Sequence, residues 1–156
     1  MMNAYKKISN ILKEDIGFLY VAKYSGSNLT DDRRKYKYGK TKDLNKRISA
    51  LKTANNGLDY EIIFHKKVDF LTVREYMVRS IIDWEREMND KTDIKMNPIF
   101  EYTGFNPIKY VDNYSNAIVE ISKSCLCIKV KSVECDDWHT IHDIEKFVNI
   151  TPKKFA

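Results

Sequence analysis

The segment between Gly17 and Arg47 constrains the fold of this chain more than any other. Within it, Phe18 to Tyr24 is short and rich in aromatic and apolar residues, residues 25–32 form a polar cluster, and Lys35 to Gly39 resumes the strand-like pattern. Two such runs joined by a polar turn predict a β-hairpin. Asp43 follows at a position suited to a helix N-cap, so we expect a helix directly after the hairpin.

Hydrophobic periodicity extends this unit on both sides. Apolar residues at helical spacing predict helices at 3–13, 44–54 and 70–88, and alternation over 60–70 predicts a third strand that pairs with the hairpin. The strongest pattern is that of the last helix, whose apolar positions are Val73, Met77, Ile81, Trp84 and Met88. The sequence therefore predicts an α/β (α+β) fold, with a small central mixed or antiparallel three-stranded sheet flanked by helices.

The last third of the chain has a different pattern of predicted strands and helices. Residues 118–133 predict one or two strands, and residues 140–148 predict a short helix. The inward-facing positions of that helix would be Ile141, Ile144, Phe147 and Val148. Because no repeat or low-complexity linker separates the two parts, we expect a domain at 1–105, with an N-terminal helix, and a C-terminal extension at 106–156 packed on it.

Positive charge is concentrated in one part of the sequence. The chain has 27 Lys and Arg against 22 Asp and Glu, a net charge of +5, and residues 33–47 contain a single acid, Asp43. The bases of this segment are Arg33, Arg34, Lys35, Lys37, Lys40, Lys42, Lys46 and Arg47. Such a cluster indicates a polyanionic partner, although a charge run of this kind is also compatible with a solvated surface.

The sequence contains few signals that indicate a cellular compartment. The apolar runs are too short to span a bilayer, and residues 1–16 lack the apolar stretch and cleavage site of a signal peptide. The three cysteines are odd in number and their spacing does not indicate a disulfide framework. We therefore expect an intracellular protein with no membrane partner, in the cytoplasm or the nucleus, and in those of a host cell if the protein is viral.

The order and spacing of several motifs resemble a known family. Gly17-Phe18-Leu19-Tyr20 is followed by Tyr36-Lys37-Tyr38-Gly39-Lys40-Thr41, then by Leu44 and Arg47, and then by a glutamate in a later helix. This arrangement resembles the GIY-YIG nuclease superfamily, in the Tyr-Lys-x-Gly-Lys-Thr form common in phages and large DNA viruses. The resemblance covers roughly residues 17–100 and leaves the C-terminal extension unexplained.

The resemblance implies a role for each matching residue. Tyr20 matches the tyrosine that acts near the attacking water as base or proton relay, and Lys37 takes the place of the second tyrosine. Arg47 matches the arginine that binds the scissile phosphate, and Glu75 matches the glutamate that holds a single divalent metal, Mg²⁺ or Mn²⁺. Asn97 is a looser match to a polar residue after the helix.

General chemistry is consistent with these roles. A metal ion and a guanidinium group can stabilise the charge on phosphoryl oxygens. Tyrosine has an ordinary pKa of about 10, so Tyr20 can act as a base near neutral pH only if a neighbouring cation such as Lys37 favours its ionised form. Tyr20 and Lys37 can face the same side of a hairpin. Arg47 lies on the apolar stripe of its helix. A charge buried there needs an oppositely charged partner, which Glu75 could supply.

Structural interpretations compete with several of these assignments. Tyr20, Tyr36 and Tyr38 could equally be packing residues of strands. Glu75 would be structural if Thr72 began the helix as part of a capping box, and would be free to face the site if Asp69 were the cap.

The sequence also departs from the family pattern. Some relatives carry a histidine or tyrosine four residues after the arginine, where this chain has Leu51, which leaves the general base open. His65 is the nearest replacement by region. A zinc site built from the residues Cys125, Cys127, Cys135, His139 and His142 is conceivable, but their spacing fits no familiar finger, and buried thiols are the favoured interpretation.

These expectations favour a metal-dependent endonuclease that hydrolyses DNA phosphodiester bonds and that could form a homodimer. Beside the four catalytic candidates, we expect the substrate-binding residues to be Arg33, Arg34, Tyr36, Tyr38, Lys40, Lys42, Lys46 and Asn97. The alternative is a non-catalytic nucleic-acid-binding or host-interaction module on the same fold. A third class, a structural protein-binding domain, predicts no affinity for nucleic acid.

Overall fold

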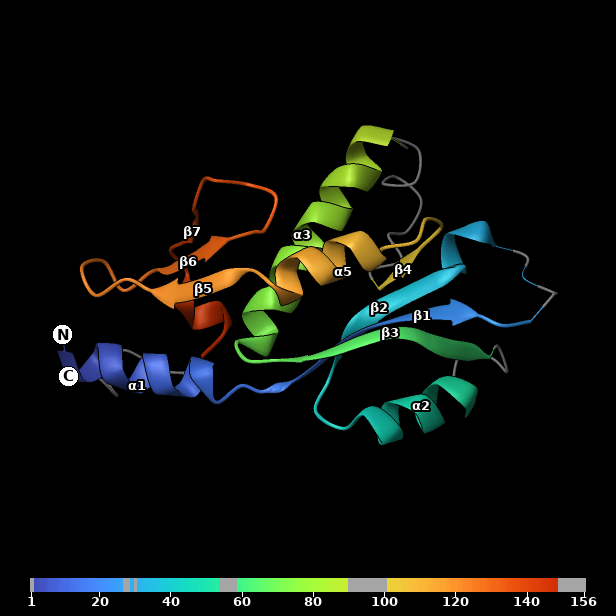
Figure 1. The fold of residues 1–156 in the computed structure, drawn as a ribbon, viewed down its shortest axis with the longest axis horizontal. Helices are drawn as coiled ribbons and strands as arrows, with labels where there is room; N and C mark the ends of the chain where they lie inside the picture. The colour runs from blue at the N-terminus through green and yellow to red at the C-terminus, as the bar shows by residue number, and fades with distance from the viewer. Residues whose placement is uncertain (1, 27–28, 30, 54–58, 90–100, 149–156) are drawn as a thin grey trace.

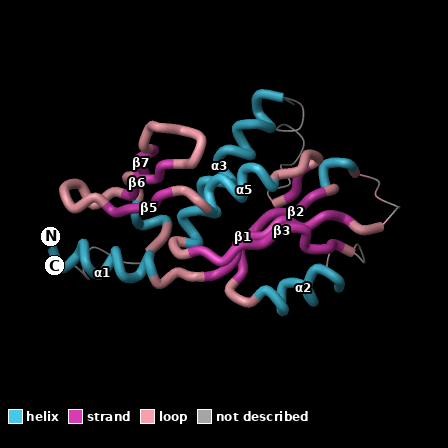
Figure 2. The backbone as a smooth tube through the Cα atoms, viewed as in Figure 1, coloured by secondary structure: helices cyan, strands magenta, loops and turns pink. Residues whose placement is uncertain are grey.

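The computed structural model describes residues 2–26, 29, 31–53, 59–89 and 101–148 (Figures 1 and 2). Its helices and strands, in chain order, are α1 (Met2–Lys13), β1 (Gly17–Tyr24), the 3₁₀ turn η1 (Asp32–Arg34), β2 (Tyr36–Thr41), α2 (Leu44–Thr53), β3 (Tyr60–Val68), α3 (Leu71–Asn89), β4 (Tyr102–Thr103), α5 (Ile108–Ser115), β5 (Ile118–Ile121), β6 (Ile128–Lys131), β7 (His139–Ile141) and the 3₁₀ turn η3 (Ile144–Lys146).

The central sheet has the strand order β3-β1-β2-β4, and all its neighbouring strands are antiparallel. Helix α2 packs beside β3 on one face, while α3 and α5 cover the other face (Figure 1). The predicted hairpin, third strand and flanking helices are confirmed, and so is the α+β class. The fourth strand was not predicted, because two residues give no periodic signal. The N-cap of α2 also follows expectation, since Asp43 Oδ1 accepts the Lys46 amide at 3.1 Å.

The main hydrophobic core lies on the α3 side of the sheet. Leu19 and Val21 of β1 pack there against Val78 and Ile82 of α3, and all four side chains are at most 1% exposed. The same continuous core takes in side chains of α1, α5 and the second sheet, whose order is β5-β6-β7. A smaller core of Tyr20, Ala22, Leu51 and Tyr60 fills the space between the sheet and α2.

The N-terminus of α3 is capped by a residue from a distant part of the chain. The Leu71 amide donates to the Asp15 carbonyl at 2.9 Å, and the Thr72 amide donates to Asp15 Oδ2 at 2.8 Å. Lys42 donates to the other carboxylate oxygen at 2.6 Å. Burial raises the pKa of Asp15, but the hydrogen bonds from Lys42 and Thr72 outweigh this effect and hold the pKa below its usual value.

The sequence offered two alternatives for the start of this helix, a Thr72–Glu75 capping box or a cap at Asp69. The structure has neither, because Asp15 caps the helix. The helix begins at Leu71, so Thr72 is a helical residue and the Thr72–Glu75 pair is not a capping box. The Thr72 hydroxyl accepts a hydrogen bond from Lys40, and the Asp69 carboxylate accepts one from Arg74. Glu75 lies in the second turn.

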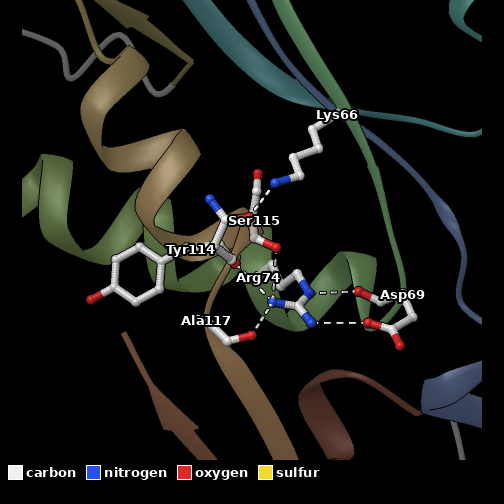
Figure 3. Close-up of polar contacts among 7 residues, drawn as sticks. Lys66, Asp69, Arg74, Tyr114, Ser115 and Ala117 are labelled. Atoms are coloured by element: carbon white, nitrogen blue, oxygen red, sulfur yellow. Dashed lines mark hydrogen bonds and ion pairs between the residues drawn. The ribbon is translucent and has the colours of Figure 1, made fainter. Parts of the chain in front are cut away.

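A buried arginine joins α3 to the end of α5 (Figure 3). Arg74 Nη1 donates to the carbonyl oxygens of Tyr114 at 2.9 Å and Ala117 at 2.7 Å, while Nε donates to the Asp69 carbonyl at 2.7 Å. Its Nη2 also bonds the Asp69 carboxylate at 2.9 Å. A cation at the C-terminus of α5 satisfies backbone acceptors that a helix end leaves without partners.

Two expectations for the C-terminal extension are wrong. The predicted helix at 140–148 is instead the strand β7 followed by η3. Pairing of Thr140 with Lys129 and of Ile141 with Ile128 determines the strand, because so short a segment forms a helix only weakly by itself. Of the four positions expected to face inward, Ile144 and Val148 are buried, and Ile141 and Phe147 are half-buried against the core.

The second wrong expectation concerns the cysteines. Cys125 and Cys127 form a disulfide, whereas Cys135 is free. The intervening Leu126 has φ = 48°, which turns the chain and brings the two Cα atoms within 5.4 Å. Spacing alone did not indicate this link, since it depends on a left-handed backbone conformation that leucine rarely adopts.

Every helix in the described part of the chain is too short or too polar to cross a membrane.

Candidate functional site

The candidate site lies on the face of the central sheet that α2 covers. Strand register pairs Tyr20 with Gly39 and Ala22 with Lys37, and directly paired residues of antiparallel strands share a face. Tyr20 and Lys37 therefore project from the same side of adjacent strands, as the hairpin model predicts. Tyr36 and Tyr38, which alternate with these positions, face the α3 side.

Gly39 leaves room for the Tyr20 ring on the neighbouring strand. A Cβ atom at position 39 would stand 2.9 Å from the Tyr20 hydroxyl and 3.2 Å from Cζ. Any side chain at position 39 would therefore have to displace the Tyr20 ring, and glycine leaves room for it. The Tyr20 side chain lies in the smaller core, where the residue is 1% exposed.

Arg47 extends from α2 toward this tyrosine. Its Cζ atom lies 5.8 Å from the centroid of the Tyr20 ring, a distance suited to a cation–π contact. Arg47 is half-buried, and no carboxylate of the described residues forms an ion pair with it. The expected pairing with Glu75 is not present. A half-buried guanidinium with no anionic partner is suited to an anionic ligand.

Lys37 contributes a second cation to the site. The residue is 8% exposed, and its Nζ atom lies 3.7 Å from Glu101 Oε2 and 5.2 Å from the centroid of the Tyr102 ring. Burial is the largest influence on this ammonium group and lowers its pKa. Glu101 partly raises the pKa and the positive charge of Arg47 lowers it further, so the pKa is below its usual value. The charges of Lys37 and Arg47 thus act on one another.

Glu75 reaches the site from α3, on the other side of the sheet. It is 7% exposed, and its Oε1 accepts a hydrogen bond of 2.6 Å from Arg79 Nη2, one turn along the helix. The same nitrogen lies 3.7 Å from Glu101 Oε1. The chain of contacts Glu75–Arg79–Glu101–Lys37 therefore connects the two sides of the sheet near its β2–β4 edge.

The electrostatics of Tyr20 are unfavourable for a phenolate. Burial raises the pKa of the Tyr20 hydroxyl to about 12; Arg47 lowers it, but Glu101, Tyr102 and Glu75 raise it. With such a pKa about one molecule in 10⁵ is ionised at pH 7. Tyr20 therefore keeps its proton near neutral pH in this arrangement.

His65 is the residue directly opposite Tyr20 on β3. The pair shares the α2 side of the sheet, and the His65 ring packs edge-on against Phe18 with centroids 6.1 Å apart. His65 is exposed to solvent, whereas Tyr20 is buried. Leu51, at the position where some relatives have a base, is a packing residue of the smaller core.

Four of the expected substrate-binding residues have structural partners instead. Tyr36 and Tyr38 are 9% and 1% exposed and belong to the main core. Lys40 Nζ donates to the Thr72 hydroxyl at 3.0 Å, and Lys42 is bound to Asp15. The structure does not bring these side chains to the α2 face.

The remaining expected binding residues are more exposed. Arg33 pairs with Asp31 at 3.0 Å, and the Arg34 guanidinium lies 5.0 Å from the centroid of the Tyr102 ring. Lys46 is exposed on α2. Asn97 lies outside the described residues.

Sequence reasoning did not identify Arg79, Glu101 or Tyr102 as parts of the site. The spacing of four between Glu75 and Arg79 is a recognisable sign of a helical ion pair. Glu101 and Tyr102 gave no such sign, because they lie far along the chain, at the start of the two-residue strand β4 and just before it.

The carboxylates of the site fit a hard divalent cation. Mg²⁺ takes one or two carboxylates and completes its shell with water and phosphate oxygens. Glu75 and Glu101, which converge on Arg79, offer oxygens of this kind. In the part of the chain that the structure describes, no three His, Cys, Asp or Glu side chains gather into a complete metal site.

Comparisons with known proteins give no match: no family model, no curated protein and no solved structure is significantly similar to this chain.

Proposed function

We propose that this protein is a metal-dependent endonuclease that hydrolyses DNA phosphodiester bonds by a one-metal mechanism of the GIY-YIG type. The observation that carries the proposal is the position of the Arg47 guanidinium, which lies beside the buried ring of Tyr20. It has no carboxylate partner among the described residues, and its positive charge lowers the pKa of Lys37. The motif resemblance supplies the reaction, and the hairpin register brings two of the matching residues, Tyr20 and Lys37, to one face.

The side chains divide the work between binding and proton transfer. Arg47 holds the scissile phosphate with its planar fork of donors, and Lys37 adds a positive charge beside it. Tyr20 keeps its proton, supports the Arg47 guanidinium with its ring and offers its hydroxyl as a relay. Glu75 would hold the metal, which when bound supplies Lewis-acid stabilisation of charge on the phosphoryl oxygens.

The cleavage assay tests this proposal through Glu75→Gln. Supercoiled plasmid and a labelled branched duplex are incubated with Mg²⁺ or Mn²⁺, and with EDTA as the metal-free control. We expect wild-type cleavage only with metal, and a loss of about 10²-fold or more in Glu75→Gln with binding largely kept. Glu87→Gln, an exposed glutamate on the same helix, is the matched control. Metal-independent cleavage, or full activity of Glu75→Gln, would contradict the assignment.

We propose that His65 is the general base, because it is exposed, opposite Tyr20, and carries an imidazole, the group that accepts protons near neutral pH. His65→Gln is expected to lower the cleavage rate about 10²-fold, the usual contribution of a general base. His142→Gln, an exposed histidine in the C-terminal extension, is the control. An unchanged cleavage rate in His65→Gln would exclude this role.

The alternative function is a non-catalytic nucleic-acid-binding or host-interaction module on the same fold. The ion pair between Glu75 and Arg79 favours it, since an engaged carboxylate is a poorer metal ligand than a free one. Wild-type protein that binds DNA but does not cut it with either metal would support this module. Absence of both activities would contradict both functions.

A further inference from the structure

The carboxylate of Glu101 occupies a position between two cations of the candidate site. Its Oε2 lies 3.7 Å from Lys37 Nζ, and its Oε1 lies 3.7 Å from Arg79 Nη2. Each oxygen therefore faces a different cation. These contacts are longer than the 2.6 Å hydrogen bond that the same Arg79 nitrogen makes to Glu75.

A phosphodiester also presents two anionic oxygens on one centre, so it can take the place of such a carboxylate. We propose that Lys37 and Arg79 form a phosphate-binding site, distinct from the Arg47 contact, and that Glu101 occupies it until a phosphodiester of the bound strand displaces the carboxylate. This inference rests on the proposed function, because it names a further part of the same site.

The exposed fractions of Glu101 and Lys37 favour exchange of the carboxylate for a phosphodiester. Glu101 is 44% exposed, so water can solvate its carboxylate when it leaves, and ion pairs of exposed groups are weak on average. The Lys37 side chain is only 10% exposed, so its charge needs an anion close by once Glu101 departs. A phosphodiester meets that need with stronger, charge-assisted hydrogen bonds.

Arg79 has donor capacity for such a ligand. Its side chain is 36% exposed, and the Nη2 atom lies near both Glu75 and Glu101. The Nε atom is buried and has no hydrogen-bond partner in the described part of the chain. Nη2 carries two N–H donors, so it can keep its hydrogen bond to Glu75 and donate to a phosphate oxygen that takes the place of Glu101.

The test measures DNA binding without divalent cation, in EDTA, so that cleavage does not interfere. Glu101→Gln keeps the size of the side chain and removes the competing charge, and we expect it to bind a labelled duplex about three- to tenfold more tightly than the wild type. Glu120→Gln removes the same charge from an exposed position on β5 in the other sheet and is expected to leave binding unchanged. Thermal melting confirms that each variant is folded.

A double variant tests whether the gain in DNA affinity depends on Arg79. Glu101→Gln combined with Arg79→Gln is expected to lose the extra affinity, because the proposed phosphate ligand is gone. Equal gains in Glu101→Gln and Glu120→Gln would mean a general charge effect and overturn the site. A gain that persists without Arg79 would overturn it too.

The outcomes also separate this inference from the proposed function. If the wild type binds DNA and Glu101→Gln binds equally or more weakly, the phosphate site is wrong while the nuclease proposal stands. Loss of metal-dependent cleavage in Glu101→Gln without tighter binding would make Glu101 a metal ligand rather than a competitor. If neither protein binds DNA, both proposals fall.

Discussion

Arg47→Ala is expected to reduce DNA cleavage by about 10²–10³-fold, the cost of removing one fixed donor that stabilises charge in a transition state. Arg47 contacts the ring of Tyr20 and lacks a carboxylate partner among the described residues, so its removal leaves no unpaired acid behind. We therefore expect the fold to survive and the effect to fall on cleavage. Arg47→Lys keeps the charge but loses the planar fork, and should show an intermediate loss.

Cleavage and binding of the same duplex are measured side by side, with Lys7→Ala on the exposed surface of α1 as a control for lost charge. An Arg47→Ala variant that cuts as fast as the wild type would remove Arg47 from the mechanism. Equal losses in Lys7→Ala would show that the total charge, rather than this arginine, determines the rate.

Arg74→Met is expected to lower the free energy of unfolding by about 3–5 kcal/mol, the largest effect on stability that we foresee. Without the guanidinium, the carbonyl oxygens of Tyr114 and Ala117 lose their donors at a buried position (Figure 3). Each buried acceptor left without a partner costs about 1–3 kcal/mol. The Asp69 carboxylate, which is 51% exposed, can be solvated and adds less.

Urea denaturation gives the measurement, with Lys109→Met, an exposed lysine of α5, as the matched control. Arg74→Lys should recover part of the stability, since an ammonium group can reach only some of the acceptors. A loss below about 1 kcal/mol in Arg74→Met would mean that water replaces the guanidinium at the end of α5.

Local patterns predicted the part of the fold that positions the site. Two runs of aromatic and apolar residues around a polar turn predicted the hairpin. Tyr20 and Lys37 can face the same side of such a hairpin, and the register of β1 and β2 confirms that they do. Helical spacing gave α3 and hence the location of Glu75. Each of these features depends on residues close together in the sequence, where periodicity carries the information.

The partners of these residues could not be predicted in the same way. Glu75 is bound to Arg79 rather than to Arg47, and Lys37 meets Glu101 from a distant segment. Such pairings depend on which element packs on which face, and no local pattern records that choice. Residues 139–141 show the same limit, because pairing with β6 overrides a weak helical pattern.

The position of Tyr20 illustrates a further limit. Its motif match predicted a base or relay, but the sequence does not contain the degree of burial that raises its pKa to about 12. Burial follows from the packing of α2 over the sheet, with Leu51 against the ring. The protonation state of a candidate catalytic group is thus a property of the assembled fold.

Asp15 is not a residue of the candidate site, but it holds two parts of the site at a fixed spacing. The carboxylate bonds Lys42, five residues before Arg47, and the Thr72 amide, three residues before Glu75. It therefore sets the distance between the half of the site that carries the arginine and the half that carries the glutamate. Changes in the linker between α1 and β1 would therefore alter the spacing of Arg47 and Glu75 while both of these residues stayed the same.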